Sequence, residues 1–210
     1  GRAISGDKLL LLLAKEMLKS KKCKVIADVK CSQVLFEEVE RLGGKIFMSK
    51  TGHSHIKNNL KKLNADLAGE MSGHIFFAKD YYGFDDAFFA AVKVLEILNN
   101  NDKKLSDLVD EIPRVFNTPE IRIDCDDNKK FDIISKITQI QKKRKKKLTN
   151  IDGVRVAEKD GWWLLRASNT QPALVLRCES LTEDGLEFQK KLVKNELSKF
   201  NINIFEKIIS

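Results

Sequence analysis

The first half of the chain alternates between segments with helical periodicity and short apolar runs that fit buried strands. In the helical segments apolar side chains recur every three or four residues, as Val34, Leu35 and Val39 do, whereas the strand segments lack this period. Asp7 is expected to cap the first helix. Alternation of this kind predicts parallel strands joined by crossover helices. The expected helices cover residues 8–19, 32–42, 54–63 and 85–100, and the expected strands cover residues 24–29, 45–48, 65–69 and 74–78.

The pattern changes after Asn99, where a polar stretch and two prolines, Pro113 and Pro119, interrupt it. Two helices against a small, largely antiparallel sheet predict an α+β domain in the second half. Its expected strands cover residues 120–125, 154–158, 161–168 and 173–179, and its expected helices cover residues 129–143 and 183–200. The predicted organisation is an α/β domain with a mixed sheet and crossover helices at 1–105, a linker at 106–116 and the α+β domain at 117–210.

The composition is that of a globular protein with a hydrophobic core, since 42% of the 210 residues are hydrophobic and 32% are charged. The longest apolar run is the five leucines Leu9–Leu13 with the following alanine, far short of the roughly 20 residues of a membrane span. It also lacks the features of a signal peptide. The 4 cysteines form no CxxC pair, so we expect reduced thiols in a cytoplasmic protein and no membrane partner.

The net charge of +8 raises the question of a nucleic-acid partner. The densest basic run is KKRKKK, Lys142 to Lys147. It can form a nucleic-acid or acidic-membrane patch, or it can be a solvated helix end, where cations suit the helix dipole. No aromatic residues interleave with it as stacking platforms for bases, which favours the helix end and predicts no nucleic-acid partner.

The stretch RASNTQPALVLRCE, which begins at Arg166, places many hydrogen-bond donors between two apolar runs. Arg166 ends one expected strand and Arg177 lies in the next, while Ser168, Asn169 and Thr170 form the connecting turn. A phosphate offers several acceptor oxygens and close to two negative charges, which forked guanidinium donors, hydroxyls and turn amides match. The alternative is an ordinary hairpin whose polar side chains serve the backbone turn. Composition alone leaves both interpretations open.

A second polar stretch, AGEMSGHIFF, runs from Ala68 to Phe77. If residues 70–74 are extended, Glu70, Ser72 and His74 point to the same side. A carboxylate, a hydroxyl and an imidazole on one face suit a polyhydroxylated ligand. A polar loop with a structural histidine explains the same residues, and this alternative also stays open.

Further candidates follow the other two strands of the first half. Lys30 comes directly after residues 24–29, and the loop KTGHSH, with His53 and His55, follows residues 45–48. Ligands of α/β sheets tend to lie at the carboxyl ends of the strands. Nothing in the spacing of these histidines, His74 and Glu70 fixes a tetrahedral metal site, so we expect no metal ligands and an exposed helical position for His55.

Four motifs in order, DVKCS, KTGHS, GEMSGH and RASNTQPALVLR, make the sequence resemble the second half of the α-D-phosphohexomutases. GEMSGH is most similar to the phosphomannomutase/phosphoglucomutase branch. The resemblance covers almost the whole chain, from about Gly6 to Phe200. It implies the third and fourth domains of a four-domain enzyme that interconverts hexose 6-phosphate and hexose 1-phosphate through a phosphoserine relay.

The resemblance also implies roles for the candidate residues. Glu70 and Ser72 would bind sugar hydroxyls, and His74 would be a candidate acid/base group. Lys30 and His53 would line the catalytic cleft. The residues that would hold the phosphate not being transferred are Arg166, Ser168, Asn169, Thr170 and Arg177.

Two features of such enzymes are absent from the sequence, the phosphoserine loop of the type TASHNP and the magnesium loop of the type DGDGDR. We therefore expect Mg²⁺ and the hexose bisphosphate intermediate to belong to the parent enzyme, and this chain to bind no cofactor and to be inactive alone. The expected partners are mannose or glucose phosphate and the missing N-terminal domains. The alternatives are a stand-alone sugar-phosphate binding module and, less favoured, a basic nucleic-acid binding domain.

Overall fold

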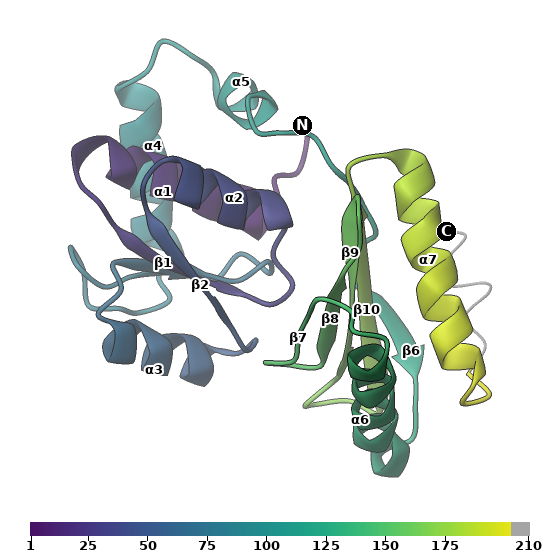
Figure 1. The fold of residues 1–210 in the computed structure, drawn as a ribbon. Helices are drawn as coiled ribbons and strands as arrows, with labels where there is room; N and C mark the ends of the chain where they lie inside the picture. Colours follow the sequence, from purple (N-terminus) through teal and green to yellow (C-terminus); the bar gives the residue numbers. More distant parts are fainter. Residues whose placement is uncertain (203–210) are drawn as a thin grey trace. The chain divides into compact units, whose positions relative to one another are not determined.

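The chain folds into two compact units, Gly1–Pro113 and a second unit that begins at Arg114 (Figure 1). The structure is a computed structural model that describes residues 1–202. Residues 203–210, the end of the domain predicted at 117–210, lie outside the described residues.

The first unit contains a four-stranded sheet with the strand order β2-β1-β3-β4. β2 and β3 pair with β1 in parallel, and β4 pairs with β3 in antiparallel orientation, which confirms the predicted mixed sheet. The elements in chain order are α1 (Gly6–Ser20), β1 (Lys24–Asp28), α2 (Gln33–Arg41), β2 (Lys45–Ser49), α3 (His53–Leu63), β3 (Leu67–Gly69), β4 (Ile75–Phe77), α4 (Ala87–Asn99) and α5 (Leu105–Asp110).

Helices cover both faces of this sheet, α1 and α2 on one side and α3 on the other (Figure 1). Ile56 and Leu60 of α3 pack in one cluster with Ile26 of β1 and Phe76 of β4. Because side chains alternate along a strand, the neighbouring positions such as Val25 face the opposite helices. The sheet is thus buried on both sides.

Two details of the first unit differ from the expectations. α1 begins at Gly6 with Ser5 at the N-cap, so Asp7 lies inside the first turn and does not cap the helix. α5 was not predicted and lies where a linker was expected. With six residues and Val109 as its buried position, it is too short to show a helical period.

The second unit is built on a six-stranded sheet, in which every pairing between strands is antiparallel. The strand order is β5-β10-β9-β8-β7, and β6 also pairs with β10. The two-residue strands β5 and β7 were not predicted. The elements are β5 (Phe116–Asn117), β6 (Ile121–Asp124), α6 (Asp127–Lys143), β7 (Leu148–Thr149), β8 (Val154–Ala157), β9 (Gly161–Ala167), β10 (Ala173–Ser180) and α7 (Glu183–Ser198).

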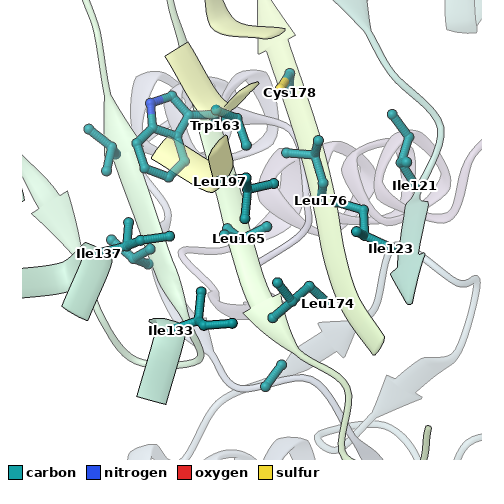
Figure 2. Packing of buried hydrophobic residues seen from close by; sticks show 14 of the residues in the cluster. Ile121, Ile123, Ile133, Ile137, Trp163, Leu165, Leu174, Leu176, Cys178 and Leu197 are labelled. Carbon is teal, nitrogen blue, oxygen red and sulfur yellow. The ribbon is translucent and has the colours of Figure 1, made fainter. Parts of the chain in front are cut away.

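One face of this sheet carries the hydrophobic core (Figure 2). Trp163 and Leu165 of β9 pack with Leu174 and Leu176 of β10, and the helices α6 and α7 cover them. The intervening positions point to the other face, because side chains alternate along a strand. On β9 and β10 these positions include tryptophan and arginine.

Candidate functional site

Three loops of the first unit meet at the end of its sheet where the strands β1, β2 and β3 finish. The strands β1, β2 and β3 are parallel, so residues 28–32, 49–53 and 70–74 all follow the carboxyl ends of neighbouring strands. This edge is where ligands of α/β sheets tend to bind. It contains Lys30, His53, Glu70, Ser72 and His74, the candidates that the sequence analysis assigned to this unit.

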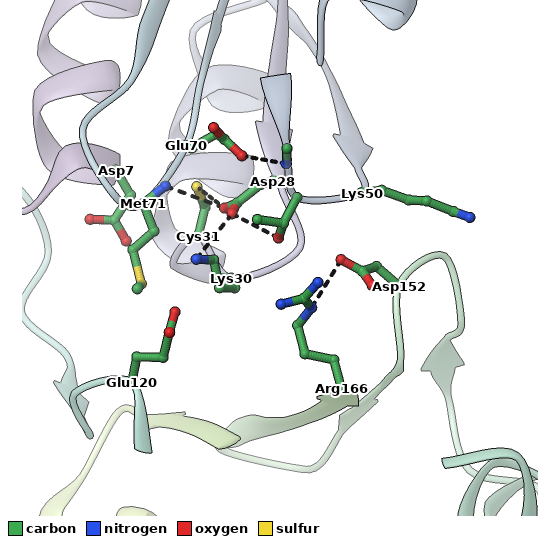
Figure 3. Close-up of polar contacts among 12 residues, drawn as sticks. Asp7, Asp28, Lys30, Cys31, Lys50, Glu70, Met71, Glu120, Asp152 and Arg166 are labelled. Atoms are coloured by element: carbon green, nitrogen blue, oxygen red, sulfur yellow. Dashed lines mark hydrogen bonds and ion pairs between the residues drawn. The ribbon is translucent and has the colours of Figure 1, made fainter. Parts of the chain in front are cut away.

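Asp28, the last residue of β1, joins the three loops (Figure 3). Its carboxylate accepts hydrogen bonds from the Cys31 thiol at 3.1 Å, from the Met71 backbone N–H at 3.3 Å and from the Thr51 hydroxyl at 3.1 Å. The Lys30 Nζ lies 3.8 Å from the Asp28 carboxylate as an ion pair. Asp28 is fully buried, and its hydrogen bonds hold the three loops in fixed positions relative to one another.

Glu70 and Asp7 connect loops in the same way. The Glu70 carboxylate accepts from the Gly52 backbone N–H at 2.6 Å, and its other oxygen lies 3.9 Å from the His53 Nε2. The Asp7 carboxylate accepts from the Ser32 backbone N–H at 2.9 Å. Glu70 is buried, and one of its oxygens already holds the neighbouring loop at Gly52. The sugar-binding role predicted for Glu70 would come in addition to this contact.

The segment 70–74 is a tight turn, so the condition under which Glu70, Ser72 and His74 would share one strand face is not met. The Glu70 N–H donates to the His74 carbonyl at 3.0 Å, and the Gly73 N–H donates back to the Glu70 carbonyl at 2.9 Å. The turn closes the hairpin between β3 and β4. Ser72 lies exposed at its tip and His74 at its far end, so the three side chains do not form one strand face.

His53 and His74 approach each other at this edge, with ring centroids 4.4 Å apart. The His74 Nδ1 lies 2.7 Å from the Asp85 Oδ2, and the His53 Nε2 lies 3.5 Å from the same oxygen. Asp85 was expected in the first turn of a helix. It instead precedes Asp86, the N-cap of α4, whose carboxylate accepts from the Phe89 N–H.

His55 takes no part in this group. It lies on α3, two residues beyond His53, and is exposed, which confirms the prediction for it.

In the second unit, the register of β9 and β10 brings the two predicted arginines to one face. Arg166 lies opposite Val175, and Arg177 lies opposite Leu164, so the arginines occupy diagonal positions two residues apart along the strands. Arg155 of β8 also lies opposite Leu164 and points to the same face. This face therefore holds three guanidinium groups.

Each of these arginines has an acidic or aromatic neighbour. The Arg166 Nε donates to the Asp152 carboxylate at 3.0 Å (Figure 3). The Arg177 Nη2 lies 3.9 Å from the Glu179 carboxylate, which also accepts from the Trp162 indole N–H at 2.9 Å.

The ring of that same tryptophan, Trp162, lies 3.7 Å below the Arg155 guanidinium carbon. A guanidinium over an aromatic face is an attractive cation–π contact. Such contacts fix the direction of the planar guanidinium donors.

The turn after β9 is organised by Ser168. Its hydroxyl oxygen accepts from the Thr170 N–H at 3.4 Å and from the Gln171 N–H at 3.2 Å. Ser168 is buried, whereas Asn169 and Thr170 are exposed. Ser168 thus serves the backbone turn, as the hairpin interpretation requires, while the exposed pair remains accessible to a ligand.

The basic run lies at the end of α6, as expected for a helix end. Arg144 pairs with Glu196 at 2.5 Å, and Lys146 pairs with Glu158 at 2.7 Å. Part of the run is therefore neutralised within its own unit. Among the described residues, no helix combines the length and apolar character needed to cross a membrane.

A cavity of about 590 Å³ in the first unit does not coincide with the candidate site. It is lined by Asp66, which precedes β3, and by Lys57, Lys61 and Tyr82. Glu70 and its loop follow β3, so the cavity lies toward the other end of the strands.

The sequence matches two families of domains. Residues 5–116 match the phosphoglucomutase/phosphomannomutase alpha/beta/alpha domain III, and residues 120–194 match the phosphoglucomutase/phosphomannomutase C-terminal domain. Fold and sequence therefore define a protein built from these two domains. The chain belongs to the phosphoglucomutase/phosphomannomutase family, as its motifs predicted.

Individual relatives agree with this assignment. A phosphomannomutase/phosphoglucomutase of Pseudomonas syringae pv. tomato is 44% identical over 200 residues, which are 95% of this chain and 43% of the relative. The crystal structure of a phosphoglucomutase/phosphomannomutase family protein from Burkholderia thailandensis superposes with a TM-score of 0.86 at 36% identity, covering 95% of this chain and 42% of that chain. This chain thus spans a little under half the length of these relatives.

A more distant structure shares the fold alone. It is the N-acetylphosphoglucosamine mutase of Aspergillus fumigatus, solved with GlcNAc-6P and magnesium. The two structures superpose with a TM-score of 0.64 at 15% sequence identity, and the match covers 93% of this chain and 44% of that chain.

Sequence reasoning missed three carboxylates of the site, Asp28, Asp85 and Asp152. A buried aspartate that ends an apolar strand was a usable signal for Asp28, because it stands in the quoted motif DVKCS. Asp85, eleven residues after His74, and Asp152, fourteen residues before Arg166, act across turns that local patterns do not describe.

Proposed function

We propose that this chain is the substrate-recognition half of a phosphohexomutase that interconverts hexose 6-phosphate and hexose 1-phosphate. The substrate class follows from the family and from relatives that are named phosphomannomutase/phosphoglucomutase. The observation that carries the proposal is the joining of three strand-end loops by Asp28, which gathers the predicted sugar-site residues of the first unit at one edge.

In the first unit, Ser72 and the Glu70 oxygen that does not hold Gly52 are the groups for sugar hydroxyls. Lys30 supplies positive charge beside them, and its pairing with Asp28 fixes its position.

His74 has the geometry of an acid/base group. With the proton of Nδ1 donated to Asp85, the lone pair of Nε2 is available to accept a proton from a sugar hydroxyl. Asp85 then positions the ring. His53, next to both, completes this side of the sugar site.

In the second unit, Arg166 and Arg177 with Ser168, Asn169 and Thr170 are proposed to hold the phosphate that is not transferred. The support is the shared sheet face of the arginines and the exposed turn beside it. A doubly charged phosphate is a stronger partner for a guanidinium than one carboxylate, so it can compete with Asp152 and Glu179.

The catalytic step belongs to the whole enzyme. A phosphoserine transfers its phosphoryl group to one hydroxyl of the hexose phosphate, and the bisphosphate reorients and returns the other phosphoryl group to the serine. Positioning and charge stabilisation dominate such catalysis. This chain supplies recognition for both orientations, and the remaining parts come from the N-terminal domains of the same enzyme.

Magnesium does not fit the candidate metal-binding group found among residues 1–202. The candidate metal-binding group among the described residues is His53, His74 and Asp85. Mg²⁺ prefers six oxygen ligands, so two imidazole nitrogens are unsuited to it. Magnesium and the bisphosphate intermediate are therefore assigned to the parent enzyme. The 4 cysteines are free thiols, which supports the cytoplasm as the site of action.

The proposal is tested by titrating the chain with mannose 6-phosphate and glucose 1-phosphate, followed by NMR chemical shifts at millimolar ligand. We expect Arg177→Ala to weaken binding by about 1.5–3 kcal/mol, because a charge-assisted hydrogen bond is lost. Arg114→Ala removes an arginine of the same unit that lies outside the predicted phosphate site and leaves binding unchanged. Equal affinity of wild type and Arg177→Ala, or no shifts in either unit, overturns the assignment.

A further inference from the structure

Two histidines and a carboxylate converge in the first unit at distances close to those around a metal ion. The His53 Nε2, the His74 Nδ1 and a carboxylate oxygen of Asp85 all lie within 4.8 Å of one another. The oxygen is 3.5 Å from the first nitrogen and 2.7 Å from the second. A second carboxylate, that of Glu70, lies 3.9 Å from the His53 Nε2.

One of these separations matches tetrahedral coordination. Ligand atoms at about 2.0–2.1 Å from Zn²⁺ are about 3.3 Å from each other in a tetrahedron. The 3.5 Å separation already fits. The 2.7 Å contact is a hydrogen bond, and it would widen when the ion replaces the shared proton of His74 and Asp85.

Charge and accessibility also suit a divalent cation. Two carboxylates beside two neutral imidazoles offset a charge of two, and imidazole with carboxylate is a ligand set for Zn²⁺, Co²⁺ or Ni²⁺. Both histidine side chains are 44% exposed and Asp85 is 24% exposed. An ion can therefore enter, and a coordination position stays open for water.

We propose that His53, His74 and Asp85 form a binding site for a divalent transition-metal ion such as Zn²⁺, with the Glu70 carboxylate next to it. The sequence predicted no metal site because it gave no reason to bring Asp85 to the two histidines. The site goes beyond the proposed function and differs from a magnesium site in its nitrogen ligands.

The consequence for the sugar site rests on the proposed function. An ion on the His53 Nε2 and the His74 Nδ1 lies among the side chains that are proposed to line the sugar site. Zn²⁺ and mannose 6-phosphate should therefore compete for the chain.

The binding test uses the 210-residue chain freed of metal by a chelator, in a Cys125→Ser background that removes its partly exposed thiol. Calorimetry with Zn²⁺ should give one ion per chain. His53→Asn, His74→Asn and Asp85→Asn should each weaken binding by at least about tenfold. His55→Asn, a matched exposed histidine on the same helix, should have no effect.

NMR assigns the ligands independently, since the chain has 3 histidines. Zn²⁺ should shift the ring signals of His53 and His74 and leave those of His55 in place. Asp85→Asn keeps an acceptor oxygen for the Ile75 N–H, and a thermal melt checks that it folds; if it does not, His53→Asn carries the test. Absence of stoichiometric binding, or equal loss in His55→Asn, overturns the metal site.

The competition arm is separate from the binding arm. Zn²⁺ binding without any sugar-phosphate binding overturns the proposed function alone. Simultaneous binding of Zn²⁺ and mannose 6-phosphate overturns the proposed competition.

Discussion

Buried carboxylates do different work in the two units of this chain. In the first unit they accept backbone N–H groups from distant loops. Asp28 binds the N–H of Met71, 43 residues away, and Glu70 binds that of Gly52, 18 residues away. A residue of one loop therefore sets the backbone of the next.

In the second unit the carboxylates hold arginine side chains instead. Asp152 pairs with Arg166, and Glu179 lies beside Arg177 and Trp162. The backbone there is fixed by the strand ladder, which pairs β9 and β10 over seven positions. The first site is thus held by a network and the second by a regular sheet that carries separately supported arginines.

This difference has consequences for mutation. Loss of one carboxylate in a network leaves several buried donors unsatisfied, so the effects spread. Loss of one side chain on a regular sheet leaves the ladder intact, so the effects stay local. Substitutions in the two units should therefore differ in how far their effects spread.

The largest effect is expected for Asp28→Ala. It removes the acceptor of the Cys31 thiol, the Thr51 hydroxyl and the Met71 N–H, and with it the carboxylate beside the buried Lys30. We expect a loss of about 3–5 kcal/mol in the free energy of unfolding, measured by urea denaturation. NMR shifts should spread over all three loops.

The matched control for the Asp28 prediction is Asp102→Ala, an exposed aspartate of the same unit. It should change the free energy of unfolding by less than about 0.5 kcal/mol. If Asp28→Ala shifts only residues 28–32, the loops are independent and the comparison between the units fails.

A smaller effect is expected for Gly153→Ala in the second unit. Gly153 has φ +79°, and an added Cβ would lie 2.4 Å from the Leu165 carbonyl oxygen and 2.6 Å from the Arg166 Cα. The loop that carries Asp152 must then move away from β9. We expect a loss of about 1–3 kcal/mol in the free energy of unfolding.

Gly43→Ala separates the two causes of the Gly153 effect. Its φ is +83°, but its Cβ would meet open space, so it reports the cost of the backbone conformation alone, about 1 kcal/mol. The additional loss in the free energy of unfolding of Gly153→Ala then measures the cost of the close contact with β9. Shifts in the Arg166 signals should accompany that variant alone, and equal costs for the two variants would contradict the structural explanation.

The sequence predicted the regular elements better than the contacts between their ends. Apolar periodicity located β1, β9, β10 and α6 to within two residues, because burial of one face dictates that pattern. The candidate residues of the site were also visible, since they stand in polar stretches at the ends of predicted strands. The partnership of His74 with Asp85 was not visible, because it depends on how separate segments pack.

The same limit explains the arginine face. Alternation along β9 and β10 was visible in the sequence, but the register that places Arg166 diagonal to Arg177 follows from the strand pairing. The pairing of each arginine with an acidic neighbour could not be predicted from charge patterns, because Asp152 precedes β8 and is separated from Arg166 by that whole strand. Sequence motifs thus identified the donors of the site but not the acceptors that position them.

The smallest effect is expected for Glu196→Gln, which asks whether carboxylate–cation pairing extends to the helices of the second unit. Burial raises the pKa of Glu196, but hydrogen bonds from Lys199 and Arg144 outweigh it and hold the pKa below its usual value of 4.5. Because the folded pKa is depressed, this stabilisation is present above pH 4.5 and is lost as the pH falls through the folded pKa. At pH 7 the variant should lose about 1 kcal/mol, since Arg144 and Lys199 are partly exposed and the pairs are screened. The difference in melting temperature between wild type and variant should shrink below pH 4.5.

The control is Glu187→Gln, which breaks a surface pair with Lys190 and should show a smaller difference in melting temperature. A difference for Glu196→Gln that does not change with pH would mean that side-chain packing, and not charge, explains its effect.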